Sequence, residues 1–329
     1  MIIVRAPLRI TLGGGGTDLP GWYKENGGFL ISAAINKYIY LTGSRRDFDN
    51  KLWLSYSQVE ICDSVDQVKH EIFAQCLEKY DISGGIEIHS ISELPGGSGL
   101  GSSGTFTVSL LRLLNIMQRR DMTMKELAEL AASIEMVELG RSCGKQDQYI
   151  AVYGGVITLE ISKNGDVNVE VLDLDSITLE SLKHNLLLYH TGVSRDANRI
   201  LSEQNDSLRR KELSSTVDMK RIQEIGYKSK EELLSGNLDE FGKLLDEHWE
   251  VKKSMSKKMS NQDIDNLYYY AKECGALGGK VMGAGGGGYF MFYVPPALHL
   301  SFRKKMVGKG LFELNWDFDF EGVTKIFSG

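Results

Sequence analysis

A glycine- and serine-rich stretch, PGGSGLGSSG at residues 95–104, stands directly before a long apolar segment. Glycine lets the backbone approach a ligand closely, and successive N–H groups in such a turn bind anions. A helix that begins near Ser103 adds the partial positive charge of its N-terminus, and the hydroxyls of Ser102 and Ser103 can cap the helix or bind a metal ion. The stretch therefore suits a di- or triphosphate with Mg²⁺, although a tight strand-to-helix turn capped by Ser103 has the same pattern.

Two better-known nucleotide motifs fit this stretch poorly. Residues 99–104 match the dinucleotide pattern GxGxxG, but no acidic residue is well placed about 20 residues further on to end a second strand and bind a ribose. A Walker A loop ends in Gly-Lys-Ser/Thr, and no lysine lies in the stretch. Neither motif is therefore the preferred interpretation.

Two further glycine-rich stretches are separated from the first in the sequence. In APLRITLGGGGTDLP, four glycines precede Asp18, and Arg9 lies on the strand that leads into them. A carboxylate on such a loop can accept hydrogen bonds from sugar hydroxyls, while an Asx-type turn is the alternative. The stretch GALGGKVMGAGGGGYF (residues 275–290) predicts either a flexible lid over a ligand or a tight corner between a helix and a strand.

Carboxylates cluster in SIEMVELGRSCGKQDQYIAVYGG, residues 133–155. Glu135 and Glu138 are about one helical turn apart and share a face, which by itself is typical of a solvated helix surface. Asp147 has polar neighbours on each side, Lys145 among them, between two apolar segments. This position makes Asp147 the stronger candidate for chemistry.

Together these segments resemble the GHMP kinase family, named for galactokinase, homoserine kinase, mevalonate kinase and phosphomevalonate kinase. PGGSGLGSSG resembles the ATP phosphate loop of the family, APLRITLGGGGTD its first motif and GGKVMGAGGGGYF its third, in the family's order and spread over most of the chain. One departure is Gly104, where many members carry alanine. Within the family, GGGGTDLPGWY, GKQDQY, YHTGVSR and HWEVKKSMS are most similar to sugar 1-kinases that act on D-glycero-D-manno-heptose 7-phosphate.

The resemblance implies roles for individual residues. Asp147 matches the catalytic aspartate, and Ser103 matches the metal-binding serine. Glu135 matches the magnesium ligand, with Glu138 as the alternative. Arg9 matches an arginine near the catalytic aspartate, and Arg9 or Lys145 would stabilise charge on the transferring phosphoryl group.

The resemblance also implies two sets of binding residues. ATP would contact the phosphate loop and the third motif, through Pro95, Gly96, Gly97, Ser98, Gly99, Leu100, Gly101, Ser102, Ser103 and Gly285. The sugar would contact the first motif and the C-terminal half, through Gly14, Gly15, Gly16, Thr17, Asp18, Arg195, Gly285 and Gly286. A phosphate on the sugar needs cations away from the metal, and the candidates are Arg195, Lys252 and Lys253.

The elements that must position these residues include both strand and helix patterns, and the resemblance implies that they form an α+β protein. The resemblance implies a two-domain fold, with a ribosomal protein S5 domain 2-like N-terminal domain at residues 1–183 and a ferredoxin-like C-terminal domain at residues 184–329. We expect strands at 2–12, 29–44, 51–57, 84–92, 154–162, 167–174 and 185–192. We expect helices at 64–80 with Ser64 as N-cap, at 105–120, at 124–140, in three segments between 197 and 260, and from 263 to Gly275.

Composition excludes some classes of protein. The 329 residues carry a formal net charge of −6, which argues against a nucleic-acid-binding surface. No cysteine pair has CxxC spacing, no signal peptide is recognisable, and no apolar run is long enough to span a membrane. We therefore expect a cytoplasmic protein. The resemblance implies an enzyme with ATP, Mg²⁺ and a small sugar or sugar phosphate as its partners, as a monomer or a homodimer.

Three other interpretations stay open from the sequence. Gly15 and Gly16 stand where galactokinases carry a Glu-His pair, which argues against galactose but leaves an unphosphorylated sugar such as fucose possible. A non-catalytic sugar- or nucleotide-binding regulator could share the fold. A dinucleotide-dependent oxidoreductase is a more distant alternative.

Overall fold

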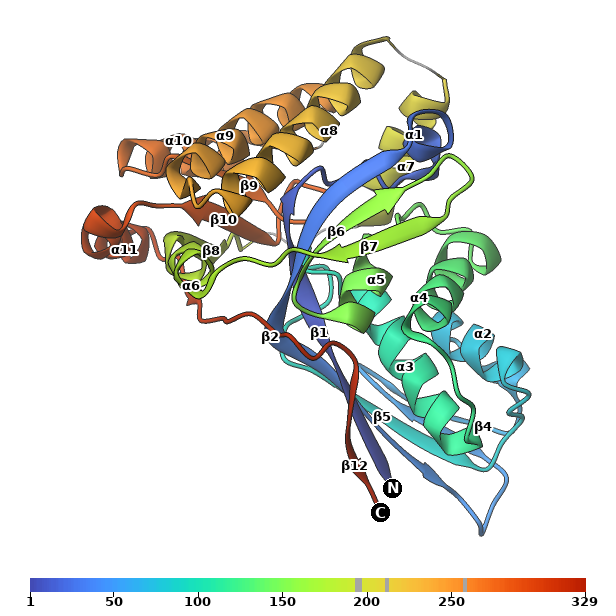
Figure 1. Ribbon diagram of the computed structural model, residues 1–329. Helices are drawn as coiled ribbons and strands as arrows, with labels where there is room; N and C mark the ends of the chain where they lie inside the picture. The colour runs from blue at the N-terminus through green and yellow to red at the C-terminus, as the bar shows by residue number, and fades with distance from the viewer. Residues whose placement is uncertain (193–196, 211–212, 257–258) are drawn as a thin grey trace.

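The larger of two sheets is built around one long, bent strand. The computed structural model describes residues 1–192, 197–210, 213–256 and 259–329 (Figure 1). Within these residues the larger sheet has eight strands, in the order β12-β1-β2-β5-β3-β4, with β6 and β7 joined to the side of β2. Its strands are β1 (Ile2–Gly13), β2 (Gly28–Arg45), β3 (Leu52–Ser55), β4 (Val59–Cys62), β5 (Ile86–Ser92), β6 (Val156–Ile161), β7 (Val167–Val171) and β12 (Thr324–Ser328).

Strand β2 connects the two parts of this sheet. Its first residues pair with β6, from Gly28 opposite Ile161, and its last residues pair with β5, up to Arg45 opposite Ile86. The neighbouring pairs are antiparallel except β3 with β5. Strands β1 and β2 are rich in β-branched and leucine side chains, and burial is nearly continuous along the second half of β1 and the first half of β2, which is typical of strands covered on both faces.

Helices cover one face of the larger sheet (Figure 1). They are α2 (Glu71–Lys79), α3 (Ser102–Gln118), α4 (Met124–Ser133) and α5 (Gln146–Tyr153). Helix α3 is apolar on most sides and is buried along most of its length, as the sequence predicts. The short helix α1 (Pro20–Asn26) follows the first glycine loop.

The smaller sheet belongs to the C-terminal half of the chain. Its order is β11-β8-β10-β9, and its neighbours are antiparallel. Its strands are β8 (Leu186–His190), β9 (Gly278–Val281), β10 (Tyr289–Tyr293) and β11 (Glu313–Leu314). The helices of this half are α6 (Ser176–Asn185), α7 (Ala197–Arg209), α8 (Leu213–Leu234), α9 (Leu238–Met255), α10 (Gln262–Glu273) and α11 (His299–Gly308), with a 3₁₀ turn η3 (Pro296–Leu298).

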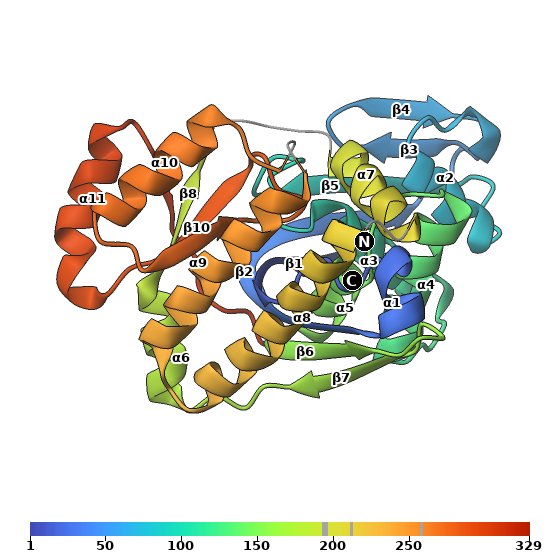
Figure 2. The ribbon, with the colours of Figure 1, turned by 90° about the horizontal axis from the view of Figure 1, so that it is seen from above.

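An aromatic cluster holds α9, α10 and α11 to the smaller sheet. Phe290 stacks on Phe292 with their ring centroids 4.3 Å apart, and Tyr268 stacks on Phe290 at 5.6 Å. Trp249 and Phe302 complete the buried cluster. Helix α8 instead crosses over β1 and β2, so it joins the two halves of the molecule (Figure 2).

The structure confirms the α+β fold and most predicted elements, but it corrects two helices. A 3₁₀ turn η1 (Val65–Gln67) and an extended break precede α2, and Ser64 makes no side-chain capping bond. The break is stabilised by the buried Glu60 carboxylate, which accepts hydrogen bonds from the backbone N–H groups of Lys69 and His70. His70, rather than Ser64, caps α2. The predicted helix at 124–140 is regular only to Ser133 and continues as a π-helical turn η2 (Ile134–Glu138).

The domain boundary at residue 183 or 184 stays a prediction. The last strand, β12, joins the larger sheet beside β1, although it follows the smaller sheet in the chain. Across the described residues, no helix combines the length and apolar character needed to cross a bilayer. The four cysteines, all of which are described, are free thiols, as the sequence predicts.

Asp319 fastens the returning C-terminal segment to the larger sheet. Its buried carboxylate accepts hydrogen bonds from the Tyr38 hydroxyl at 2.9 Å and from the Gly322 N–H at 2.8 Å. We expect Asp319→Ala to lower the free energy of unfolding by about 1–3 kcal/mol, because buried donors lose their acceptor. Urea unfolding measures this change. Glu321→Ala is the control, since Glu321 makes an exposed ion pair with Arg5 and its removal should change stability by less than about 0.5 kcal/mol. Equal effects of the two substitutions would contradict the anchoring role.

Candidate functional site

The phosphate loop joins β5 to α3 and uses glycine where the backbone is left-handed. Gly97, Gly99 and Gly101 have φ angles of 75°, 80° and 85°. Gly101 is the N-cap of α3, and no side chain caps this end of the helix. The hydroxyl of Ser103 instead donates to Glu135, so Ser103 is not the simple cap that the sequence left possible. The first N–H groups of α3 are therefore available to an anion.

The C-terminal glycine loop, residues 282–288, packs directly on the phosphate loop. The Tyr289 N–H donates to the Ser98 carbonyl at 3.1 Å. A Cβ on Gly99 would lie 2.5 Å from the Met282 carbonyl oxygen, and one on Gly283 would lie 2.8 Å from the Gly99 oxygen. Gly99 and Gly283 must therefore be glycine, because the two backbones meet at these positions. As a result, segments about 180 residues apart in the chain form one surface.

Arg9 connects β1, the phosphate loop and α5. Its Nε donates to Asp147 Oδ1 at 2.7 Å, and its guanidinium also donates to the Gly99 carbonyl at 2.5 Å. The Arg9 side chain is only 6% exposed, while that of Asp147 is 29% exposed, so the guanidinium is shielded from water and the carboxylate can still be reached from the cavity. The pairing that the sequence comparison predicted is present, and it holds Asp147 beside the phosphate loop.

Helix α5 approaches its neighbours at two glycines. A Cβ on Gly104 would lie 2.6 Å from the Cβ of Asp147, and a Cβ on Gly144 would lie 1.9 Å from Asp18 Oδ2. Asp18 accepts a hydrogen bond from the Gln146 N–H at 3.0 Å, near the start of α5. Burial raises the pKa of Asp18. Gly104, which departs from the alanine of many family members, thus lies where this structure has no room for a side chain.

Ser103 and Glu135 form a second polar group on the other side of Asp147. Glu135, 1% exposed, also accepts from Gln148 Nε2 at 2.8 Å. Arg141 donates to the Ser103 hydroxyl at 2.9 Å and lies 3.5 Å from the Glu135 carboxylate. Burial raises the pKa of Glu135, and the hydrogen bond from Ser103 opposes this effect. The π-helical turn η2 places Glu135 there, whereas Glu138 faces outward and pairs with Lys79 at 2.9 Å.

Lys145 requires a correction. Its ammonium group donates to both carboxylate oxygens of Glu129 at 2.8 Å and to the Gly165 carbonyl at 2.7 Å. Lys145 therefore faces away from Asp147 and fastens the start of α5 to α4. The physical reason is that Lys145 is the N-cap residue of α5 and its ammonium group is held by Glu129 of α4 and the Gly165 carbonyl.

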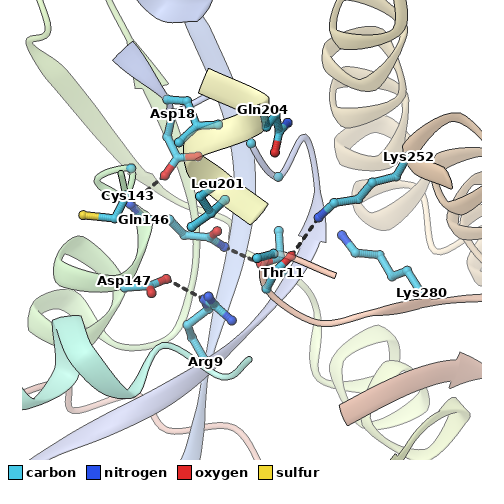
Figure 3. A pocket seen from close by; sticks show the side chains of 16 residues that line it. Arg9, Thr11, Asp18, Cys143, Gln146, Asp147, Leu201, Gln204, Lys252 and Lys280 are labelled. Atoms are coloured by element: carbon cyan, nitrogen blue, oxygen red, sulfur yellow. Dashed lines mark hydrogen bonds and ion pairs between the residues drawn. The ribbon is translucent and has the colours of Figure 1, made fainter. Parts of the chain in front are cut away.

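A cavity lies between the two halves of the molecule, beside Arg9 and Asp147 (Figure 3). Carboxylates line one side of it and lysines the other, as Figure 3 shows for Asp18, Asp147, Lys252 and Lys280. The lining is contributed by β1, the first and the C-terminal glycine loops, the start of α5 with the residues before it, α7, α9 and β9. It comprises Arg9, Thr11, Gly15, Gly16, Asp18, Leu19, Cys143, Gly144, Gln146, Asp147, Leu201, Gln204, Lys252, Lys280, Gly283 and Ala284.

The predicted sugar-binding residues separate into two groups. Gly15, Gly16 and Asp18 line the cavity, but Gly14 and Thr17 do not. The fully buried hydroxyl of Thr17 lies 2.8 Å from the Gly14 carbonyl and 2.7 Å from the Phe29 carbonyl, so it shapes the loop.

Of the binding residues predicted in the C-terminal half, some line the cavity and others do not. Gly283 and Ala284 line the cavity in place of Gly285 and Gly286. Lys252 lines it, while Lys253 pairs with Glu250 at 2.7 Å and lies over the rings of Tyr268 and Tyr269. Arg195 lies outside the described residues.

Three residues of the site, two of which line the cavity, were not singled out from the sequence. Gln146 donates to the Thr11 hydroxyl at 2.6 Å and to Ser32 at 3.0 Å, which fixes α5 to β1 and β2. Lys280 was within the quoted third motif, and its signal was a lysine between glycine and apolar residues. Arg141 could have been found as a cation close in sequence to Glu135 and Asp147.

This arrangement can bind a polyphosphate and an alcohol side by side. The phosphate loop and the start of α3 offer N–H groups to an anion, and Asp147 lies next to them to accept a hydrogen bond from a hydroxyl. Among the described residues, no three His, Cys, Asp or Glu side chains gather to hold a metal by themselves. Ser103 and Glu135 therefore suit a hard cation that takes its other ligands from phosphate and water.

Comparison with known proteins identifies similar chains along the whole length. Residues 67–155 match the family model of the GHMP kinases N terminal domain, and residues 229–297 match that of the GHMP kinases C terminal domain. A D-glycero-alpha-D-manno-heptose 7-phosphate kinase from Campylobacter jejuni is 30% identical, over 98% of each chain.

Two solved structures are similar in fold. A D-glycero-D-manno-heptose 1-phosphate kinase from Bacteroides thetaiotaomicron superposes with a TM-score of 0.82 at 26% identity, over 100% of each chain. A Lactococcus lactis galactokinase in complex with galactose has a TM-score of 0.79, at 21% identity over 99% of this chain and 95% of its own, and shows likeness in fold alone.

A substitution of Thr17 tests whether its hydroxyl stabilises the first glycine loop or contacts the sugar. We expect Thr17→Val to lower the free energy of unfolding by about 1–3 kcal/mol, because buried backbone groups lose a partner. Thr17→Ser keeps the hydroxyl and should retain most of the stability in urea unfolding. Unchanged stability of Thr17→Val, together with a raised KM for the acceptor, would instead support the substrate contact that the sequence predicted.

Lys252 offers a test of the buried charge in the cavity. Burial, together with Arg9, lowers the pKa of Lys252 from its ordinary 10.5 to about 8. Below pH 8 the folded protein carries the full cost of a buried ammonium group, and between pH 8 and 10.5 this cost falls away as the folded protein releases the proton. We expect Lys252→Met to be more stable than the wild type at pH 7 by on the order of 1–3 kcal/mol, and to lose this advantage by pH 10.5. Urea unfolding at several pH values measures it, and an advantage independent of pH would contradict the assignment.

Proposed function

Because this chain belongs to the GHMP kinase family and is an ATP-dependent sugar kinase, we propose that it phosphorylates the anomeric hydroxyl of D-glycero-D-manno-heptose 7-phosphate. The product would be the 1,7-bisphosphate. The observation that carries the proposal is the position of Asp147, whose Cγ would lie 3.2 Å from a Cβ on Gly101 of the phosphate loop. A carboxylate so close to the loop can direct an alcohol toward the terminal phosphate of a bound nucleotide.

Asp147 and Arg9 act together in this proposal. The carboxylate accepts a hydrogen bond from the anomeric hydroxyl and takes its proton as the new oxygen–phosphorus bond forms, while the bond between the terminal phosphoryl group and ADP breaks and ADP leaves. Arg9 orients Asp147 through the 2.7 Å ion pair, and its guanidinium, which also donates to the Gly99 carbonyl, lies near the phosphate loop to offset charge on the transferring group. Positioning and charge stabilisation dominate phosphoryl transfer, so a weak base is sufficient.

Ser103 and Glu135 are the proposed protein ligands of Mg²⁺. The Glu135 carboxylate is buried with Ser103 and Gln148 as its neighbours, and oxygen donors of this kind suit a hard dication. When bound, the ion would neutralise charge on the phosphates of ATP. In this chain, Gln148 orients the carboxylate through one oxygen and leaves the other directed at Ser103.

Asp18 is the proposed ligand of the other sugar hydroxyls. Its Oδ2 already accepts a hydrogen bond from the Gln146 N–H, and Gly144 leaves it space at the edge of the cavity.

A heptose 7-phosphate as the acceptor is supported by the named activity of the Campylobacter jejuni relative and by the cationic side of the cavity at Lys252. The second candidate is an unphosphorylated sugar such as fucose, which the carboxylate side of the cavity would also suit.

A substrate panel tests the identity of the acceptor. Heptose 7-phosphate, free heptose, fucose and galactose would be incubated with ATP and Mg²⁺, and ³¹P NMR would identify the phosphorylated position. We expect the highest kcat/KM for heptose 7-phosphate, with a new phosphate at the anomeric carbon. Preference for fucose would establish the second candidate, and ATP binding without any product would indicate a non-catalytic regulator.

Asp147→Asn tests the catalytic carboxylate. We expect kcat to fall by about 10²–10⁴-fold while ATP binding by titration calorimetry stays close to that of the wild type, because the change removes a base and leaves the phosphate loop in place. Asp173→Asn is the control, since Asp173 is exposed and lies after β7. Wild-type turnover in Asp147→Asn would exclude this residue from the mechanism.

A further inference from the structure

The ammonium group of Lys280 is buried in the cavity without a partner. Lys280 extends from β9, is 1% exposed, and its Nζ meets no hydrogen-bond acceptor among the described residues. A buried cation without an acceptor is costly to the folded protein, because the group has lost its water. The side chain nevertheless points into the cavity, where a ligand can supply the missing acceptor (Figure 3).

Lys252 reaches the same wall of the cavity from α9. It is 5% exposed, and its Nζ donates to the Gly283 carbonyl at 2.7 Å, which leaves further donors of the ammonium group unused. Burial lowers the pKa of Lys280, and the positive charge of Lys252 lowers it further. Burial also lowers the pKa of His248, with smaller contributions from the two lysines. His248 lies fully buried behind them and offers neither lysine a negative charge.

The carboxylates of the cavity do not neutralise these lysines. Asp147 is paired with Arg9, and Asp18 accepts the Gln146 N–H on the opposite side. No ion pair joins Lys252 or Lys280 to a carboxylate within the described part of the chain. Two ammonium groups side by side therefore form a pocket that suits a group with two negative charges.

We propose that Lys280 and Lys252 form a phosphate-binding subsite on the wall of the cavity opposite Asp18, separate from the phosphate loop. The subsite deepens the proposed function, on which its biological role rests, because it selects for a phosphoryl group near the acceptor. Lys280 Nζ would lie 3.9 Å from a Cβ on Gly15, in the predicted sugar-binding loop. Lys252 touches Gly283, which packs on Gly99 of the phosphate loop.

Two sources can supply this phosphate. One is the phosphate that the acceptor already carries, which would enter with the sugar. The other is the terminal phosphate of ATP as it moves toward the acceptor. Both are dianionic phosphoryl groups, and the position of the lysines between the two glycine loops allows either.

The test compares Lys280→Gln with Lys253→Gln, a control on α9 whose lysine points out of the cavity. Binding of inorganic phosphate to each purified full-length protein would be measured by titration calorimetry without ATP or sugar. We expect Lys280→Gln to weaken it at least about tenfold, because one charged hydrogen bond is lost, and Lys280→Arg to recover part of it. Lys253→Gln should bind as the wild type does. Equal binding by the wild type and Lys280→Gln would overturn the subsite.

Kinetics then distinguish the source of the phosphate. A rise in KM for heptose 7-phosphate but not for free heptose in Lys280→Gln would assign the subsite to the acceptor. A fall in kcat that is equal for the two sugars would assign it to the transferring phosphate. The wild type could also phosphorylate none of the sugars while Lys280→Gln still binds phosphate more weakly than the wild type. In that case the proposed function would fail and the subsite would stand. Normal kinetics and normal phosphate binding would overturn the subsite alone.

Discussion

The buried guanidinium of Arg9 is the contact on which the site depends. A planar cation that is removed from water needs acceptors in fixed directions, and it has two here, the Asp147 carboxylate and the Gly99 carbonyl. The backbone N–H of Arg9 also donates to the Leu100 carbonyl. Strand β1, the phosphate loop and helix α5 are therefore fastened at one point, and loss of any partner would leave a buried charge unpaired.

Close packing against neighbouring segments, more than flexibility, explains the most informative glycines. Gly104 lets α3 lie against Asp147, Gly144 makes room for Asp18, and Gly99 and Gly283 let the two glycine loops touch. Each contact brings together segments that are distant in sequence. The reactive groups are thus held by packing around these positions, which agrees with the need for accurate positioning in phosphoryl transfer.

The cavity also joins charges of opposite sign from the two halves of the chain. The carboxylates come from the N-terminal half, on the first glycine loop and α5, while the lysines come from α9 and β9 (Figure 3). A ligand with hydroxyl groups at one end and a phosphate at the other would match this division. The arrangement depends on α8, which lies over β1 and β2 and connects the two halves.

From the sequence and the family resemblance came the α+β class, most of the strands and helices, the glycine-rich turn before α3, and the closeness of Arg9 to Asp147, whereas the short strands β4, β9, β11 and β12 were not predicted. These features depend on local patterns, namely alternating polarity, capping and glycine-rich turns, or on motifs whose order the family resemblance supplied. Only the tertiary structure decided which charged side chains enter the cavity. Lys145 turned to Glu129, Glu135 rather than Glu138 met Ser103 through a π-helical turn, and Lys280 entered the cavity from β9. The direction of a side chain at the end of a helix or strand depends on distant partners, which sequence spacing does not contain.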